Sequence, residues 1–139
     1  MNRYSESSRR QLETCHEDLQ KVFAVVLALF DHTVIEGHRS KERQRQLYAE
    51  GKTQKNGVTD LSRHNVFPSE AVDALPYPID WGDRERMSFF AGYVIATAER
   101  MLHEGLIRHR IRWGGDWDRD TEVKDNRFDD LPHFELVAP

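Results

Sequence analysis

Cysteine is nearly absent from the sequence, which contains only Cys15 among its 139 residues. A single thiol forms no internal disulfide, and the neighbouring Leu12, Leu19 and Val22 predict a small buried apolar residue rather than a nucleophile. A chain of this length fits one domain, residues 1–139, and buries roughly 70% of the surface that its unfolded form exposes. We therefore expect a single domain that folds without disulfides.

Long hydrophobic runs and an excess of one charge are also missing. The longest apolar run, residues 22–30, follows a charged leader and is too short to cross a bilayer of about 30 Å. No cleavage-site pattern is present, so neither export nor membrane insertion is expected. The formal net charge is −4 with Lys and Arg spread through the chain, which argues against nucleic acid as a partner.

Motifs for nucleotide cofactors and for serine nucleophiles are absent as well. The chain has no G-x-G-x-x-G, no P-loop and no G-x-S-x-G elbow. His103 and His109 stand six residues apart, about 240° around a helix, whereas a helical zinc pair needs a spacing of four. Cations near the negative end of a helix explain this segment better.

The acidic loop at residues 116–130 begins like a calcium-binding loop. However, Thr121 and Arg127 occupy the positions where an EF-hand needs glycine and a bidentate glutamate. The segment is therefore not an EF-hand. A solvated acidic loop is the favoured interpretation, and a weaker Ca²⁺ site in residues 116–130 stays open as the alternative.

Hydrophobic periodicity predicts an α+β fold. Helical spacing of apolar residues indicates three helices, over residues 8–30, 40–51 and 83–105. Short β-branched or alternating segments indicate strands at residues 33–35, 71–75, 107–113 and 133–137. With no linker to divide the chain, about three helices should pack on a small, mostly antiparallel sheet.

The stretch SRHNVFPSEAVDAL, residues 62–75, contains a histidine and an aspartate that suggest half of a metal site. Asp73 lies on a predicted buried strand, where a carboxylate is costly unless it is paired or bound to a metal. His133 opens the last strand, three residues after Asp130. Two histidines and a carboxylate form the ligand set of a catalytic zinc site, and a free carboxylate nearby activates water. On spacing alone, His64 as a loop residue and His133 as a polar strand end remain the alternative.

The order of these motifs resembles the zinc peptidoglycan peptidases, which include D-Ala-D-Ala carboxypeptidases and phage L-alanyl-D-glutamate endopeptidases. The family pattern is Ser-x-His, then Ala-x-Asp, then an acid three residues before a final histidine. The matching segments here are Ser62-x-His64, Ala71-x-Asp73 and Asp130-x-x-His133, with support from residues 37–40, 51–53 and 113–117. The resemblance, closest to single-domain phage endolysins, implies a Hedgehog/D-Ala-D-Ala peptidase-like fold with the zinc site at the sheet edge.

Carried over residue by residue, the resemblance implies a role for each member of the site. His64, Asp73 and His133 match the zinc ligands, and Asp130 matches the catalytic base. Arg39 matches the arginine that stabilises charge developing on the scissile carbonyl. One Zn²⁺ ion is therefore the implied cofactor.

A substrate groove is predicted beside these residues. Trp113, Gly114 and Trp117 would form a wall along which an extended stem peptide adds to a strand edge, with core packing as the alternative for the tryptophans. Ser62 either bonds a ligand or substrate or caps its own turn. One departure from the family pattern is a loop two residues longer, with Phe67-Pro68 where many relatives have glycine, which leaves the shape of the adjoining wall open.

The resemblance implies a phage endolysin that cleaves the L-Ala-D-Glu bond of peptidoglycan stem peptides during host lysis. A D-Ala-D-Ala carboxypeptidase is the alternative within the enzyme class, and a non-catalytic, zinc-stabilised cell-wall-binding module is the alternative outside it. We expect a monomer that accumulates in the host cytoplasm and acts on the wall after another component breaches the membrane.

Overall fold

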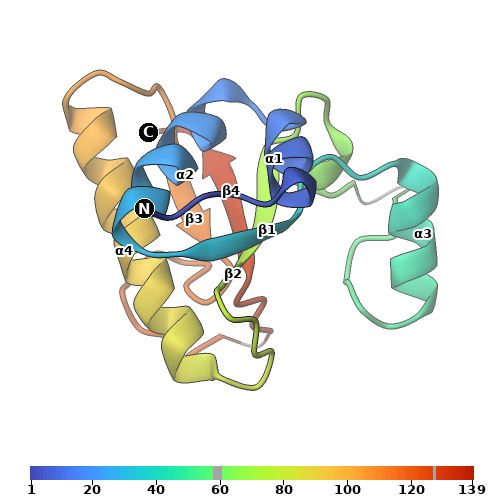
Figure 1. The fold of residues 1–139 in the computed structure, drawn as a ribbon. Helices are drawn as coiled ribbons and strands as arrows, with labels where there is room; N and C mark the ends of the chain where they lie inside the picture. The colour runs from blue at the N-terminus through green and yellow to red at the C-terminus, as the bar shows by residue number, and fades with distance from the viewer. Residues whose placement is uncertain (58–60, 127) are drawn as a thin grey trace.

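A four-stranded antiparallel sheet organises the fold (Figure 1). The computed structural model describes residues 1–57, 61–126 and 128–139, so Arg127, compared above with a calcium-loop position, lies outside it. Across the sheet the strands are β1 (His32–Glu36), β2 (Ala71–Pro76), β4 (His133–Val137) and β3 (Arg110–Trp113). All four predicted strands are present, although β3 begins three residues later than the alternating pattern suggested.

The strand register brings distant parts of the sequence into direct contact. Asp73 on β2 is opposite His133 at the start of β4, and it is also the partner of Glu36 on β1. Directly opposed residues of an antiparallel pair have Cβ atoms about 4.5–5.5 Å apart. The sheet therefore places two predicted ligands side by side on its two central strands. The predicted position of the zinc site, at the sheet edge, is thereby refined to these two strands.

In the described part of the chain, four α-helices and one short 3₁₀ helix accompany the sheet. α2 (Glu17–Leu29) and α4 (Arg84–His103) pack together, and α1 (Glu6–Glu13) lies along β1. α3 (Lys41–Ala49) stands apart from the other helices, at the right of Figure 1. The 3₁₀ helix η1 (Arg63–Asn65) contains His64, whose side chain is buried.

The helix predicted over residues 8–30 is in fact two helices. The backbone N–H of His16 donates to the carbonyl of Ser69 at 2.8 Å, and the N–H of Ser69 donates to the carbonyl of Thr14 at 2.8 Å. These groups are thereby taken out of the helical i to i−4 pattern, and the side chain of His16 caps the new start of α2. The helix is interrupted here because the backbone of Thr14 and His16 is hydrogen-bonded to Ser69, in the segment that leads into β2.

The core lies between the sheet and the helices α2 and α4. Phe134 of β4 makes edge-to-face contacts with Phe23 of α2 and Phe90 of α4, at ring separations of 5.5 and 6.0 Å. Cys15 is buried at the margin of this core, and burial raises the pKa of its thiol to about 12. The prediction that Cys15 is a small buried residue is therefore confirmed.

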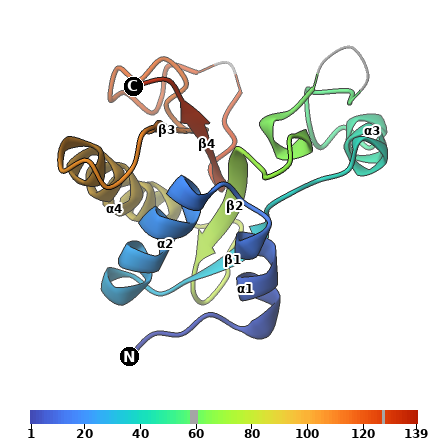
Figure 2. The same ribbon diagram turned by 90° about the horizontal axis from the view of Figure 1, so that it is seen from above.

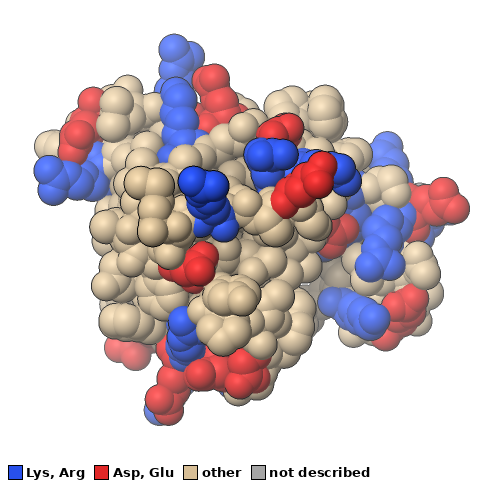
Figure 3. Space-filling view, viewed as in Figure 1, with Lys and Arg blue, Asp and Glu red and all other residues tan. Residues whose placement is uncertain are grey.

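The helices and the surface were compared with what binding to a membrane or to nucleic acid requires. Within residues 1–57, 61–126 and 128–139, no helix has both the length and the apolar character that a membrane span requires. On the face shown in Figure 3, basic and acidic side chains are interspersed rather than gathered by sign. That face therefore presents no continuous basic stripe.

Candidate metal centre

Three side chains from separate segments converge at the start of β4. His64 Nε2 lies 3.2 Å from Asp73 Oδ1 and 3.3 Å from His133 Nδ1, and His133 Nδ1 lies 3.4 Å from Asp73 Oδ1. The three atoms form a nearly equilateral triangle. A tetrahedral zinc ion with bonds of about 2.0–2.1 Å places its ligand atoms about 3.3–3.4 Å apart. The spacing of this cluster therefore fits a zinc-sized ion.

Hydrogen bonds on the far side of each imidazole decide which nitrogen faces the cluster. His64 Nδ1 is 2.7 Å from the carbonyl oxygen of Gly37, which only accepts, so Nδ1 carries the proton. His133 Nε2 donates in the same way to Glu135 Oε1 at 2.8 Å. In their neutral form both imidazoles direct a lone pair toward the carboxylate of Asp73. Three such atoms this close together need a positive charge among them, supplied by a proton or by a metal cation.

The electrostatics of the cluster agree with that requirement. Burial raises the pKa of Asp73, but the neighbouring His64 and His133 outweigh it and hold the pKa well below its usual range. Burial lowers the pKa of His133, but hydrogen bonds to Asp73 and Glu135 outweigh it and raise the pKa to about 10. The cluster thus stabilises a positive charge among its ligand atoms.

Glu135 supports this cluster, a role that the sequence reasoning missed. Its carboxylate accepts from His133 and from Arg112 Nη2 at 2.6 Å, and it forms an ion pair with Arg63, whose Nε lies 3.0 Å away. Burial raises the pKa of Glu135, but the bonds from His133 and Arg112 outweigh it and lower the pKa to about 2. The available signal was the spacing, because residues two apart on a strand share one face.

Arg39 is buried beside the cluster and orients its carboxylate. The guanidinium donates to both oxygens of Glu36, at 3.1 and 2.9 Å, and to Gln44 Oε1 at 2.8 Å. It also donates to Asp73 Oδ2 at 3.3 Å, the oxygen that does not face the histidines. The structure therefore brings Arg39 to the site as a partner of Asp73, and its action on a substrate carbonyl stays a prediction.

Asp130 lies next to the ligand triangle without belonging to it. Its Oδ2 is 4.0 Å from His133 Nδ1, and its side chain is 37% exposed. Burial and the negative charge of Asp73 raise the pKa of Asp130. A carboxylate beside the ligands, with its oxygens accessible and its proton affinity increased, has the properties of a general base.

Gly114 positions the backbone of Asp130. Its N–H donates to the carbonyl of His133 at 2.8 Å, and its carbonyl accepts from the N–H of Asp130 at 2.8 Å. A Cβ at residue 114 would overlap the carbonyl oxygen of Asp130, so only glycine permits this approach. The chain itself uses both backbone groups of Gly114, and a substrate contact at Gly114 stays a prediction.

The other predicted substrate residues divide between core and groove. Trp113 is 6% exposed and its indole donates to the carbonyl of Leu131, so it packs in the core and its predicted contact with substrate is corrected. Trp117 lines the groove, with its ring 5.6 Å from that of His133. Ser62 lines the groove too, and its Oγ accepts from the N–H of His64 at 3.2 Å, so it caps the turn that carries this ligand.

A groove of about 640 Å³ opens over the cluster. Its walls come mainly from residues 53–55, 61–64, 117–118, 126, 128 and 130, in segments that lie on the side of the molecule away from the N-terminus in Figure 2. Neither Phe67 nor Pro68 is among the described residues that line it. Phe67 is 71% exposed and packs edge-on against His38 at 5.2 Å. Phe67 and Pro68 of the longer loop therefore form no part of the described wall of the groove.

Asp116, Asp118 and Asp120 form a second group with the donor atoms of a metal site. The backbone N–H groups of Asp120 and Thr121 donate to the two oxygens of Asp116, at 3.1 and 2.9 Å. These bonds are those of an exposed acidic turn. A Ca²⁺ ion in residues 116–130 stays a prediction.

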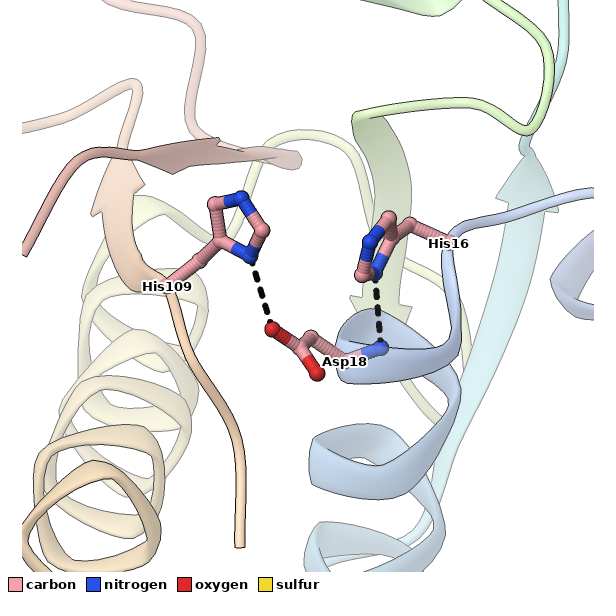
Figure 4. Close-up of side chains that lie close together, drawn as sticks. All are labelled: His16, Asp18 and His109. Carbon is pink, nitrogen blue, oxygen red and sulfur yellow. Dashed lines mark hydrogen bonds and ion pairs between the residues drawn. The ribbon is translucent and has the colours of Figure 1, made fainter. Parts of the chain in front are cut away.

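His16, Asp18 and His109 form the third such group (Figure 4). Asp18 Oδ2 accepts from His109 Nδ1 at 2.8 Å and from the N–H of Arg108 at 3.0 Å, while the N–H of Asp18 donates to His16 Nδ1. Each group in this network already has a hydrogen-bond partner, so we assign it to linking α2 with the segment before β3. The rejection of His103 and His109 as a helical zinc pair is confirmed, because α4 ends at His103.

Asp18→Asn is expected to lower the free energy of unfolding by about 1.5–3 kcal/mol at pH 7, the usual contribution of hydrogen bonds to a buried charge. Burial raises the pKa of Asp18, but the donors from His109 and Arg108 outweigh it and leave the pKa lowered. A lowered folded-state pKa gives stability that is present above the unfolded pKa and is lost as the pH falls through the folded value.

Urea unfolding of wild type and Asp18→Asn at pH 7 and at about pH 3 measures this difference. The two proteins should differ less at the acidic pH. Glu17→Gln, an exposed neighbour in the first turn of α2, serves as the control and should stay close to wild type. An equal difference at both pH values would show that the charge of Asp18 is not the cause.

A ligand cluster of two imidazoles and one carboxylate, set in an open groove beside a free carboxylate, is the arrangement found in metallopeptidases. The chain belongs to the phage L-alanyl-D-glutamate peptidase family, whose pattern it matches over residues 1–137. It is also similar to the crystal structure of the L-Ala D-Glu endopeptidase ChiX of Serratia marcescens, at 27% identity and a TM-score of 0.65, over 98% of this chain and 91% of that one. The resemblance and the α+β fold inferred from the sequence are confirmed, and the protein is a peptidase.

Proposed function

We propose that this peptidase hydrolyses the L-alanyl-D-glutamate bond of peptidoglycan stem peptides with one zinc ion held by His64, Asp73 and His133. The observation that carries the proposal is the ligand triangle, with separations of 3.2 to 3.4 Å and a hydrogen-bond partner on the far side of each imidazole. The family and the similar endopeptidase support the choice of bond.

The chemistry divides between the metal and the residues around it. When bound, zinc polarises the scissile carbonyl and lowers the pKa of a coordinated water to about 7. Asp130 accepts a proton from the attacking water and delivers it to the nitrogen of the leaving amine. Arg39 fixes the carboxylate of Asp73 and adds positive charge where negative charge develops on the carbonyl oxygen. Trp117 supplies an aromatic wall for the peptide.

The biological role that follows is that of a phage endolysin. The family name assigns these peptidases to phages, and the groove is open enough to admit a segment of a polymer. In this proposal the protein works as a monomer and acts on the cell wall once another component has breached the membrane. A Ca²⁺ ion in residues 116–130 would be an addition to this scheme, and calorimetric titration of wild type and Asp118→Asn with calcium tests it.

Zinc analysis combined with digestion of purified peptidoglycan tests the proposal. We expect one zinc ion per chain and products with a new N-terminal glutamate, identified by mass spectrometry. Release of free D-alanine would indicate a carboxypeptidase instead, and binding without cleavage would indicate a wall-binding module. Lysis of outer-membrane-permeabilised bacteria should stop on addition of a chelator and resume when zinc is restored.

A further inference from the structure

Two arginines that the proposed mechanism does not use flank Glu135 in the groove. Arg112 Nη2 lies 2.6 Å and Arg63 Nε lies 3.0 Å from the same oxygen, Oε2 of Glu135. Both arginines line the groove, and their side chains are 30% and 40% exposed respectively. Arg63 also pairs with Glu70 at 3.5 Å, so the two arginines face two carboxylates and their guanidinium groups stay accessible from the groove.

Both guanidinium groups retain donors for a ligand. A guanidinium has five N–H groups. Within residues 1–57, 61–126 and 128–139, Arg63 Nη1 has only a long bond of 3.5 Å to Glu70, and Arg112 Nη1 has only a long bond of 3.5 Å to the carbonyl of Trp117. Arg112 also lies over the ring of Trp117 at 5.7 Å, which holds the plane of its guanidinium in place.

We propose that Arg63 and Arg112 bind the free carboxylate of the substrate glutamate, the residue whose nitrogen is released on cleavage. This inference rests on the proposed function. Glutamate has two carboxyl groups, and a peptide that continues beyond it uses one of them, so the other is free. Paired N–H donors of arginine match the geometry of a carboxylate and distinguish it from a neutral amide.

The position of the pair relative to the metal centre supports this assignment. Glu135 accepts from His133 through Oε1 at 2.8 Å and holds both arginines through Oε2. One carboxylate therefore fixes the anion site next to a ligand of the proposed zinc ion. Arg63 and Arg112 act as specificity-determining residues, while the reacting atoms are handled by the metal centre and Asp130.

The experiment compares two peptides that differ at one group: the carboxyl of this glutamate that is not part of the peptide chain is a free carboxylate in one and an amide in the other. For wild type we expect kcat/KM to be about 10- to 100-fold higher for the carboxylate, the range given by a hydrogen bond to a charged group. Arg63→Gln and Arg112→Gln should each reduce that preference, chiefly through KM, and the double variant should remove it. Cleavage of the amide peptide should fall less than cleavage of the carboxylate peptide.

Arg110→Gln is the matched control, because Arg110 lies two residues earlier on β3 and pairs with Glu99 at 2.9 Å, but does not line this groove. It should keep the full preference.

Zinc content is measured for every variant. Any variant that loses zinc or folding is replaced by Arg112→Lys, which keeps the charge but not the paired donors. Arg112→Lys should show an intermediate preference. A wild type that cleaves both peptides equally, or variants that keep the full preference, would overturn the site alone. Cleavage of neither peptide would overturn the proposed function and this site with it.

Discussion

Asp130→Asn is expected to keep the fold and the zinc ion and to lose hydrolysis of peptidoglycan by about 10²- to 10⁴-fold, the usual contribution of a general base. The carboxylate lies 4.0 Å from His133 Nδ1 and outside the ligand triangle, so metal binding does not depend on it. The bonds that hold this residue in place, to Gly114 and His133, come from its backbone. The substitution therefore removes the proton acceptor without removing a structural contact.

Initial rates of muropeptide release, measured together with zinc content and circular dichroism, check this result. Asp129→Asn provides a matched control, because the neighbouring carboxylate pairs with Arg84 at 2.6 Å on the surface and not with the ligands. It should retain activity close to wild type. Full activity in Asp130→Asn or Asp130→Ala would remove the assignment of the base. A loss of similar size in Asp129→Asn would show that disturbance of the loop is the cause.

The candidate ligand set could be predicted from the sequence because each of its members lies in a short local motif of the family pattern. Asp73 stands within an apolar strand where a carboxylate needs a partner, and His133 opens another strand. Antiparallel pairing of β2 with β4 then places the two opposite each other. The partners behind the ligands were missed, because the carbonyl of Gly37 and the role of Glu135 depend on which nitrogen of each imidazole faces the cluster.

The apolar periodicity of the sequence predicts the position of Trp113 but not that of Trp117. Trp113 continues the alternation of Ile107 and Ile111, which are both buried, so the pattern itself indicated that Trp113 lies in the core. The same alternation turns Arg112 to the opposite face of the sheet. Trp117 follows two glycines and a bend, where no period applies. Its place in the groove is set by contacts with His133 and with the carbonyl of Phe128, which local sequence does not encode.

The break between α1 and α2 has a similar cause. Leu12, Cys15 and Leu19 keep the helical phase on both sides of it, so the apolar pattern gives no sign of an end. The break is made by hydrogen bonds to Ser69, more than fifty residues away in the chain. Tertiary contacts of this kind override local propensity, and they become visible only when the packing of β2 is known.

His133→Ala is expected to abolish zinc binding and, with it, hydrolysis and the stabilisation that zinc gives to the fold. A ligand present at about 1,000 times its Kd stabilises the folded state by about 4 kcal/mol, so adding zinc should raise the thermal midpoint of wild type and leave that of His133→Ala unchanged. Glu135→Gln keeps the ligand but weakens its support, and should lower zinc affinity by about 10- to 100-fold.

His109→Ala identifies which cluster holds the ion, because His109 belongs to the separate group with His16 and Asp18. Its zinc content after dialysis should stay at one ion per chain, and chelator competition should give wild-type affinity. Zinc lost from His109→Ala and kept in His133→Ala would move the metal to the group at the start of α2. Asp18 already engages Nδ1 of both His16 and His109, while His64, Asp73 and His133 bring three ligand atoms within 3.4 Å of one another. The graded loss from Glu135→Gln to His133→Ala is therefore the expected result.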